Sequence, residues 1–284
     1  MIRAVNLFMI ILLIVGAFVS SFSQHHKDAG DFSNLTPLSE IDSLQLANLP
    51  VLTLPEWLKN SKTDLPPVVD NSENMYWRPV FAQTMYECGQ SSSVGLGYTY
   101  EVNRLRDLPS DVAENQYATH FTWNFGNGGN GWFGVSYFHT FEILRTLGNP
   151  NVPTYGGMTS PDGARWMSGY DKYYASMKNR LYEAYQIDVS TAEGIETAKH
   201  WLHNHLEDSD IGGVANFYAN APYGMSTLPA GTPGAGQYVV LSWSSANHAL
   251  TISGYHDSIC WDYNNDGQYT NNIDINGDGE VTVR

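Results

Sequence analysis

The order of sequence patterns along this chain constrains its fold more than any other feature. Apolar residues recur at helical spacing in the first two-thirds, at 89–104, 135–147, 170–187 and, after the capping box Ser190-Thr-Ala-Glu193, up to about residue 206. Beyond that point, β-branched and aromatic residues predict strands at 212–218, 238–243, 248–255 and 258–262. Helices followed by strands predict an α+β fold with a helical lobe and a sheet lobe. The aromatic, glycine-rich stretch 117–131 is predicted to be a loop.

Residues 1–23 have the pattern of a secretory signal peptide. A basic residue, Arg3, precedes an apolar run at 7–19, and small residues follow before Gln24. The run is too short for a comfortable transmembrane helix, although an uncleaved anchor is the alternative. We therefore expect an exported protein, secreted or at the cell surface, with no membrane association after the signal is cleaved.

The rest of the chain divides by composition. Residues 24–64 lack sustained periodicity and are interpreted as a leader, a propeptide-like segment or a linker, while 65–261 form the main domain and 262–284 an acidic segment. With 29 acidic and 14 basic residues the formal net charge is −15, which disfavours nucleic acid and anionic membranes as partners.

Cys88 is one of two cysteines, and it stands where an irregular segment gives way to a helical pattern. A thiol at a helix N-terminus meets unpaired N–H groups, which favour the thiolate. His248 opens an apolar run that reads as a buried strand, and Gln83 lies shortly upstream of Cys88. Thiolate, imidazole and an amide donor for an oxyanion are what thiol catalysis requires. The alternative for an exported chain is a disulfide between Cys88 and Cys260.

These residues resemble the motifs of papain-like cysteine peptidases. Gln83 and Cys88 match the family's glutamine and helix-start cysteine, Asn127-Gly128-Gly129 matches its substrate-groove loop, and His248-Ala249 matches the start of its histidine strand. The resemblance implies a two-lobed fold, a helical lobe followed by an antiparallel β-sheet lobe, with the active site in the cleft. It also implies hydrolysis of peptide bonds in a peptide or protein substrate.

The resemblance assigns roles within that site. Cys88 would attack the carbonyl, His248 would transfer the proton and Gln83 would stabilise the oxyanion. The backbone of Asn127, Gly128 and Gly129 would bind extended substrate.

The chain departs from the family pattern beside the nucleophile. Gly89 stands where the family usually has tryptophan, and the interval from Gln83 to Cys88 is one residue shorter than usual. The sequence can also be aligned with the family motif in a second register. There, Cys88-Gly89 matches the family's non-catalytic Cys-Gly pair and Ser91 takes the place of the nucleophile. The same register aligns Thr99-Tyr-Glu101 with a family Thr-x-Glu. We prefer Cys88, because the first register keeps the interval to the Asn-Gly-Gly loop.

The group that orients the histidine is the least complete part of the pattern. The family uses an asparagine in an Asn-Ser-Trp motif, which this sequence lacks; Asn264 lies near the right interval, and the motif itself is expected beyond Arg284. The alternative function is therefore a catalytically inactive papain-like module, or a dockerin-type binding module, at the cell surface.

The acidic segment contains a doubled sequence with the spacing of calcium-binding loops. Oxygen-bearing side chains at positions one, three and five, followed by glycine, match the calcium-loop template. The residues are Asp262, Asn264 and Asp266 in the first loop, and Asp274, Asn276 and Asp278 in the second. The pattern resembles dockerin modules and implies structural Ca²⁺ and a cell-surface partner, with no organic cofactor. The alternative is a plain acidic turn.

His200, His203 and His205 share a predicted helix and could suggest zinc. No acid or cysteine completes a ligand set, so we interpret them as a solvated helix face.

Overall fold

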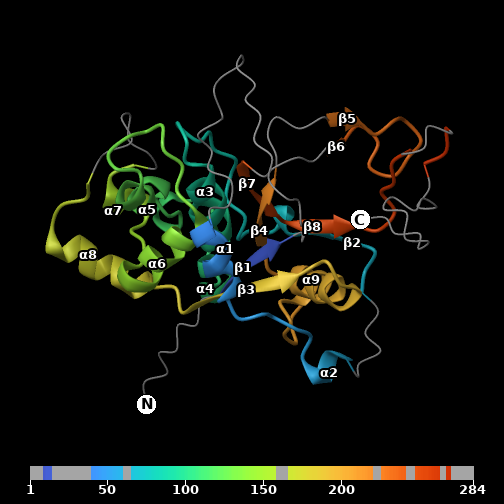
Figure 1. The fold of residues 1–284 in the computed structure, drawn as a ribbon, viewed down its shortest axis with the longest axis horizontal. Coiled ribbons are helices and arrows are strands. Elements are labelled where there is room, and N and C mark those ends of the chain that lie inside the picture. Colours follow the sequence, from blue (N-terminus) through green and yellow to red (C-terminus); the bar gives the residue numbers. More distant parts are fainter. Residues whose placement is uncertain are drawn as a thin grey trace.

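The computed structural model describes residues 9–14, 40–59, 65–157, 166–219, 225–240, 247–262 and 267–269. It combines a group of helices with one four-stranded sheet and two small antiparallel sheets (Figure 1). The predicted mixture of helices and antiparallel strands is therefore confirmed, although strands also occur early in the chain.

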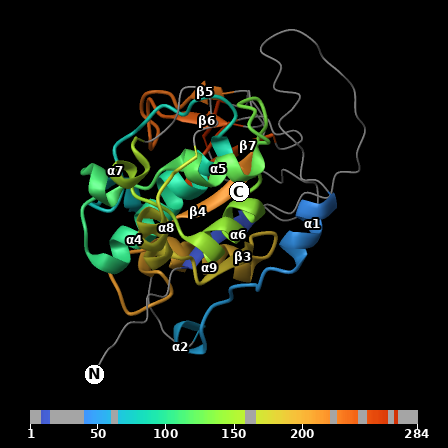
Figure 2. The same ribbon diagram turned by 90° about the vertical axis from the view of Figure 1, so that its left-hand side faces the viewer.

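One long helical segment positions the rest of the described chain. It consists of α3 (Cys88–Gln90), the π-helical η3 (Ser91–Tyr98) and α4 (Thr99–Arg106), and it ends at Asp107 in a left-handed conformation. This confirms the helix predicted at 89–104. Val94, Tyr98 and Val102 are fully buried along it. The segment lies between helices α5 and α6 on one side and strands β4 and β7 on the other (Figures 1 and 2).

The flanking helices differ in how well the sequence predicts them. Helix α6 (Tyr137–Leu147) starts where the Ser136 hydroxyl accepts the His139 N–H, and it agrees with the prediction for 135–147. Helix α5 (Thr119–Gly126) replaces part of the loop predicted at 117–131, because its Phe121 and Trp123 side chains are buried rather than displayed on a loop. The shorter helices are α1 (Glu40–Ala47), α2 (Glu56–Lys59), η2 (Asn71–Glu73), η4 (Ala113–Asn115), α7 (Val152–Tyr155), α8 (Tyr170–Ser176) and η5 (Met177–Asn179).

The main sheet has the order β3-β1-β4-β7. Strand β1 (Met9–Ile14) pairs in parallel with β3 (Glu183–Asp188) and with β4 (Ala215–Ala219), and β4 pairs antiparallel with β7 (His248–Ile252). The small sheets join β2 (Val68–Asp70) to β8 (Gly254–His256), and β5 (Met225–Thr227) to β6 (Tyr238–Val240).

Three local predictions are wrong. The stretch 170–187 is not one helix but α8, η5 and strand β3, since its aromatic residues satisfy both periods. Residues 258–262 form no strand. Helix α9 (Ala192–Asn204) is capped by Thr191, whose hydroxyl accepts the Gly194 N–H, rather than by Ser190.

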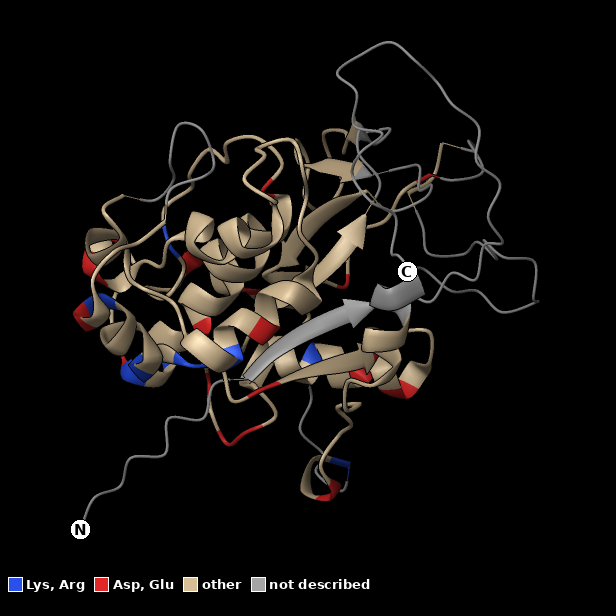
Figure 3. Ribbon diagram, turned by 60° about the vertical axis from the view of Figure 1, so that its left-hand side comes forward, with Lys and Arg blue, Asp and Glu red and all other residues tan. Residues whose placement is uncertain are grey.

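Four buried clusters lie within the described residues, and two of them hold the long helical segment and the main sheet in place. The first joins the long helical segment to α6 and includes Cys88, Tyr98, Tyr137 and Phe141. The second packs α9 against the main sheet around Trp201. Acidic and basic residues are interspersed on the described helices (Figure 3). No described helix is both long enough and apolar enough to cross a membrane.

Candidate active site

The structure brings Cys88 to the strand that His248 begins. Cys88 is the first residue of α3 and is 7% exposed, and α3 packs against β7. The backbone N–H groups of Ala249 and Gly89 lie near the Cys88 thiol and act to lower its pKa. Ala249 is buried and follows half-buried His248 in β7. A residue predicted to be a nucleophile and the residue next to its predicted base are therefore in direct contact.

The surroundings of the two groups favour their neutral forms. Burial raises the pKa of Cys88, the backbone N–H groups lower it by less, and the charge of Glu87 adds to the increase. Burial also lowers the pKa of His248. The expectation that the helix N-terminus would favour a thiolate is wrong for this arrangement, because desolvation outweighs the N–H groups.

Neither cysteine is in a disulfide. Cys88 and Cys260 are both free, and the Cys260 thiol lies 3.5 Å from the Ser258 carbonyl oxygen. The disulfide alternative is therefore wrong, and a free thiol stands at the helix start.

Gln83 lies on an exposed turn before α3. Its side-chain amide donates to the Met85 carbonyl oxygen at 3.3 Å, and Met85 itself has a positive φ of 58°. In this structure the amide is thus engaged within its own turn.

The Asn-Gly-Gly loop lies beside that turn. Asn127 is buried and its side-chain oxygen accepts the Gly129 N–H at 2.9 Å, while Gly128 and Gly129 have positive φ values of 61° and 77°. Both glycines are exposed. Gly131 connects the loop to the turn, because its carbonyl accepts the Tyr86 N–H at 3.2 Å. The predicted substrate-binding backbone therefore lies next to the segment that leads into Cys88.

Gly89 has no room for a side chain. A Cβ atom there would lie 2.4 Å from the Val135 carbonyl oxygen, so the tryptophan usual in the family after the nucleophile could not be accommodated. Ser91, the nucleophile of the second register, has a buried hydroxyl with no hydrogen-bond partner among the described residues. Both observations fit the second register and keep it open.

A buried polar network lies beneath the site, and sequence reasoning missed it. The Tyr137 hydroxyl donates to Ser92 at 2.8 Å, and the Ser92 hydroxyl lies 2.9 Å from the Asn216 side-chain oxygen and 2.8 Å from the Thr251 hydroxyl. These residues come from α6, the π-helical segment, β4 and β7. The network fixes the helical segment against the strand that bears His248. Nothing in the spacing of these four residues signals their contact.

Most of the predicted calcium segment lies outside the described residues. Asn264, Asp266, Asp274, Asn276 and Asp278 all do so. In the described part, the Asp262 carboxylate accepts the Gly267 N–H at 2.9 Å, which closes a loop from the first to the sixth position of the template. Among the described residues no group of three or more His, Cys, Asp or Glu side chains could hold a metal ion.

The histidines of α9 and of its C-cap, His205, do not form a solvated face. His200 and His205 are buried, and burial lowers the pKa of His200. His205 contacts the Glu101 carboxylate at 2.9 Å. That interpretation is therefore wrong for these two residues, which belong to the interior.

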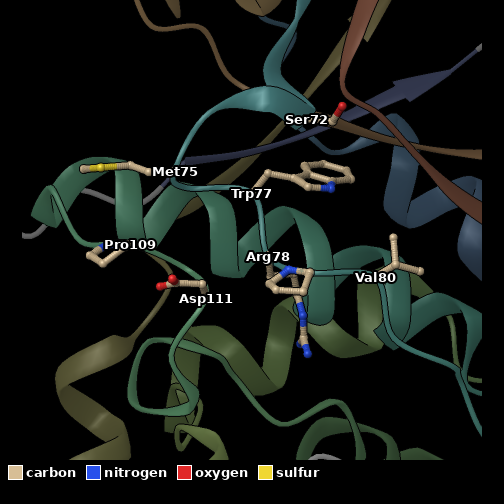
Figure 4. Close-up of a pocket in the computed structure, with 8 residues that line it drawn as sticks. Ser72, Met75, Trp77, Arg78, Val80, Pro109 and Asp111 are labelled. Carbon is tan, nitrogen blue, oxygen red and sulfur yellow. The ribbon is translucent and has the colours of Figure 1, made fainter.

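A surface hollow of ≈ 470 Å³ lies on the segment that precedes the turn (Figure 4). Its lining residues are Ser72, Met75, Trp77, Arg78, Pro79, Val80, Pro109 and Asp111. Cys88 and His248 are not among them, so this hollow is separate from the candidate site.

Comparisons with known proteins add little to this geometry. No family model matches the sequence, and no curated protein matches it. Among solved structures, the chain is similar to xylellain, a cysteine protease from Xylella fastidiosa, with a TM-score of 0.49 and 13% identity over 75% of this chain and 77% of that chain. A likeness at this level says nothing about which residues of this chain take part in a reaction.

Proposed function

We propose that this protein is an exported cysteine peptidase with a papain-like, two-lobed domain at 65–261 and its active site in the cleft between the lobes. The observation that carries the proposal is the packing of α3 against β7, which brings the Cys88 thiol beside Ala249 in one buried cluster. It joins a free, helix-starting thiol to the first residues of a strand that opens with histidine. Cysteine and histidine in this relation are suited to acyl transfer.

The reaction starts from a neutral pair. His248 removes the proton from Cys88 as the sulfur attacks the carbonyl carbon of the substrate. The Cys88 backbone N–H and the Gln83 amide stabilise the oxyanion, once that amide has left the Met85 carbonyl. The C–N bond then breaks, and His248 returns the proton to the leaving amine. Water, activated by the same imidazole, releases the acid and restores the thiol.

The loop at 127–131 is the proposed binding surface for substrate. Gly128 and Gly129 are exposed, and a Cβ built on either would meet no atom within 4 Å. An extended peptide can therefore approach this backbone closely and pair with it as an added strand. The substrate class is an unfolded or extended segment of a peptide or protein.

We further propose that Ca²⁺ orders the acidic segment 262–284, which would bind a cell-surface partner as dockerin-like modules do. The Asp262–Gly267 contact supports the first loop of this proposal. Asn264 would be the orienting group for His248 only if it is not a Ca²⁺ ligand, because its side-chain oxygen cannot serve both roles. The exported location rests on the signal pattern at 1–23, so strand β1 would leave with the signal.

The test is hydrolysis of unfolded casein by the purified mature protein and its variants. Cys88→Ala and His248→Ala should each abolish hydrolysis, while Cys260→Ala should retain it as the matched cysteine control. Retained hydrolysis in Cys88→Ala would refute the proposed nucleophile.

A second candidate function is a catalytically inactive papain-like module that binds peptide. The tight contact of Gly89 with Val135 favours it, because it supports the register in which Ser91 stands at the nucleophile's position. Loss of hydrolysis in Ser91→Ala but not in Cys88→Ala would establish a serine nucleophile in that register. Peptide binding without hydrolysis by the wild-type protein would establish the inactive module.

A further inference from the structure

We infer that Glu87 and His120 are positioning residues that hold the turn between Gln83 and Cys88 in the form needed for catalysis. The inference rests on the proposed function, because it assigns the turn a role in that reaction. Neither residue belongs to the motifs that the sequence reveals. Both side chains are 0% exposed, although both are polar.

The two side chains close a ring with Thr84. The Glu87 carboxylate accepts the Thr84 backbone N–H at 2.8 Å through one oxygen. Its other oxygen lies 3.1 Å from His120 Nε2, and the Thr84 hydroxyl lies 3.0 Å from the same nitrogen. The ring thus ties both ends of the turn to helix α5, which carries His120.

Glu87 also starts the helix that bears the nucleophile. Its backbone carbonyl accepts the N–H groups of Gln90 at 3.0 Å and Ser91 at 2.8 Å. Glu87 therefore contacts the turn through its side chain and the start of the helix through its backbone carbonyl. Loss of the Glu87 side-chain oxygen that accepts the Thr84 N–H alters how the turn meets the first turn of the helix.

A buried carboxylate is costly unless it is paired, so its presence here demands a reason. His120 supplies one partner, and the ring of Trp123 tilts over the imidazole at a centroid distance of 4.7 Å. The Glu87 charge also opposes the lowering of the Arg78 pKa, which burial reduces to about 10. Glu87 and His120 are thus an ion pair by distance, and the Glu87 Oε2 atom that faces His120 makes no hydrogen bond to a described residue.

The turn needs such a constraint. Met85 has a φ of 58°, a conformation that non-glycine residues adopt only when the surroundings impose it. Released from Thr84 and Glu87, the turn would relax, and the Gln83 amide, once it had left the Met85 carbonyl, would no longer be held where it can meet the same oxyanion as the Cys88 backbone N–H. Oxyanion donors act mainly on the transition state, so the loss should appear in kcat rather than in KM.

The test compares Glu87→Gln with Glu87→Ala in the mature protein. Glutamine keeps an oxygen for the Thr84 N–H and a polar group beside His120, whereas alanine keeps neither. We expect Glu87→Ala to lower kcat by about tenfold or more, with KM changed by less than about twofold, and Glu87→Gln to restore kcat to within about threefold of wild type. Glu142→Ala, an exposed change on α6, is the matched control.

Hydrogen exchange of the peptide covering 83–88 separates this inference from the proposed function. Exchange should be faster in Glu87→Ala and close to wild type in Glu87→Gln, whether or not the protein hydrolyses peptides. If Glu87→Ala exchanges faster than wild type but the wild-type protein hydrolyses no peptide, the proposed peptidase activity is refuted and the constraint on the turn stands. Unchanged exchange in Glu87→Ala would overturn the inference. Faster exchange in Glu87→Ala together with an unchanged kcat would overturn it as well.

A shorter acid covers the case in which Glu87→Ala does not fold. Glu87→Asp keeps the charge near His120 but falls one methylene short of the Thr84 N–H. It should therefore show the same loss of kcat and the same faster exchange. A folded Glu87→Asp with wild-type kcat would overturn the inference.

Discussion

Cys88 and Ala249 share one buried cluster, where the start of the long helix packs against the start of strand β7. Ala249 is buried, and its neighbour His248 is half-buried. The contact holds the thiol in an apolar setting, where a charged sulfur is disfavoured. Reactivity at this site should therefore depend on proton transfer at the moment of attack rather than on a preformed thiolate.

The first prediction concerns the pH dependence of Cys88 alkylation. Burial raises the pKa of this thiol, so the thiolate fraction at pH 6 is small and the rate of reaction with iodoacetamide should rise about tenfold per pH unit up to the raised pKa. Rates of labelling, followed by mass spectrometry of the peptide containing Cys88, provide the measurement. His248→Ala should leave this profile in place while abolishing hydrolysis. A rate that is already maximal at pH 6 would contradict the neutral pair.

The sequence predicted the long helix and the strand of His248 because both have a clear period. It missed α5, since Trp123 and Phe121 beside glycines suggest a loop until their burial is known. It also missed β3, because aromatic residues at 170–187 fit a helix as well as a strand. For the proposed site, the motifs single out Cys88, His248 and the glycine loop, and their roles stay predictions. The Glu87–His120 pair depends on how α5 packs against the turn, and no local pattern encodes that packing.

The second prediction concerns the polar network beneath the site. In Tyr137→Phe, the Ser92 hydroxyl loses the hydrogen bond that it accepts from Tyr137, and we expect the free energy of unfolding to fall by about 1–2 kcal/mol. The ring itself stays buried, so packing is preserved. Urea unfolding of the variant provides the measurement, and Tyr170→Phe, at a side chain that is 87% exposed, is the control. Equal stability of both variants would show that the network adds nothing.

The third prediction concerns calcium. If Ca²⁺ gathers the acidic side chains from Asp262 onward, its binding to the folded form should raise the melting temperature. A ligand at about 100 times its dissociation constant adds roughly 2.7 kcal/mol. Millimolar Ca²⁺ should raise the melting temperature and a chelator should reverse the rise. Asp262→Ala should weaken the effect, whereas Asp257→Ala, outside the loop, should not. An unchanged melting curve in Ca²⁺ would refute the site.

The fourth prediction concerns export. If 1–23 are a signal peptide, the exported protein should begin near Gln24, as N-terminal sequencing would show. The mature chain must then fold without β1, the strand that pairs with β3 and β4. Export of a chain that retains Met9–Ile14 would instead make those residues a permanent part of the sheet.

The fifth prediction concerns the buried pair of Glu101 and His205. Their side chains meet at 2.9 Å, with Arg104 3.6 Å from the carboxylate and Glu207 3.7 Å from the other imidazole nitrogen. Burial lowers the pKa of His205, but the charge and hydrogen bond of Glu101, aided by Glu207, outweigh burial and Arg104, so the pKa is raised overall. The folded protein therefore binds this proton more tightly than the unfolded chain does.

A raised histidine pKa stabilises the folded protein fully below the unfolded pKa of about 6.5, and that contribution is lost as the pH rises through the folded pKa. Glu101→Gln removes the counter-charge and leaves a cost for burying the imidazolium. The variant should therefore lose more stability at pH 5.5 than at pH 8.5, as urea unfolding at the two values would show. Glu196→Gln, an exposed change on α9, is the control. A loss that is equal at both pH values would mean that Glu101 stabilises the fold through its hydrogen bond to the Val214 N–H and not through the charge of His205.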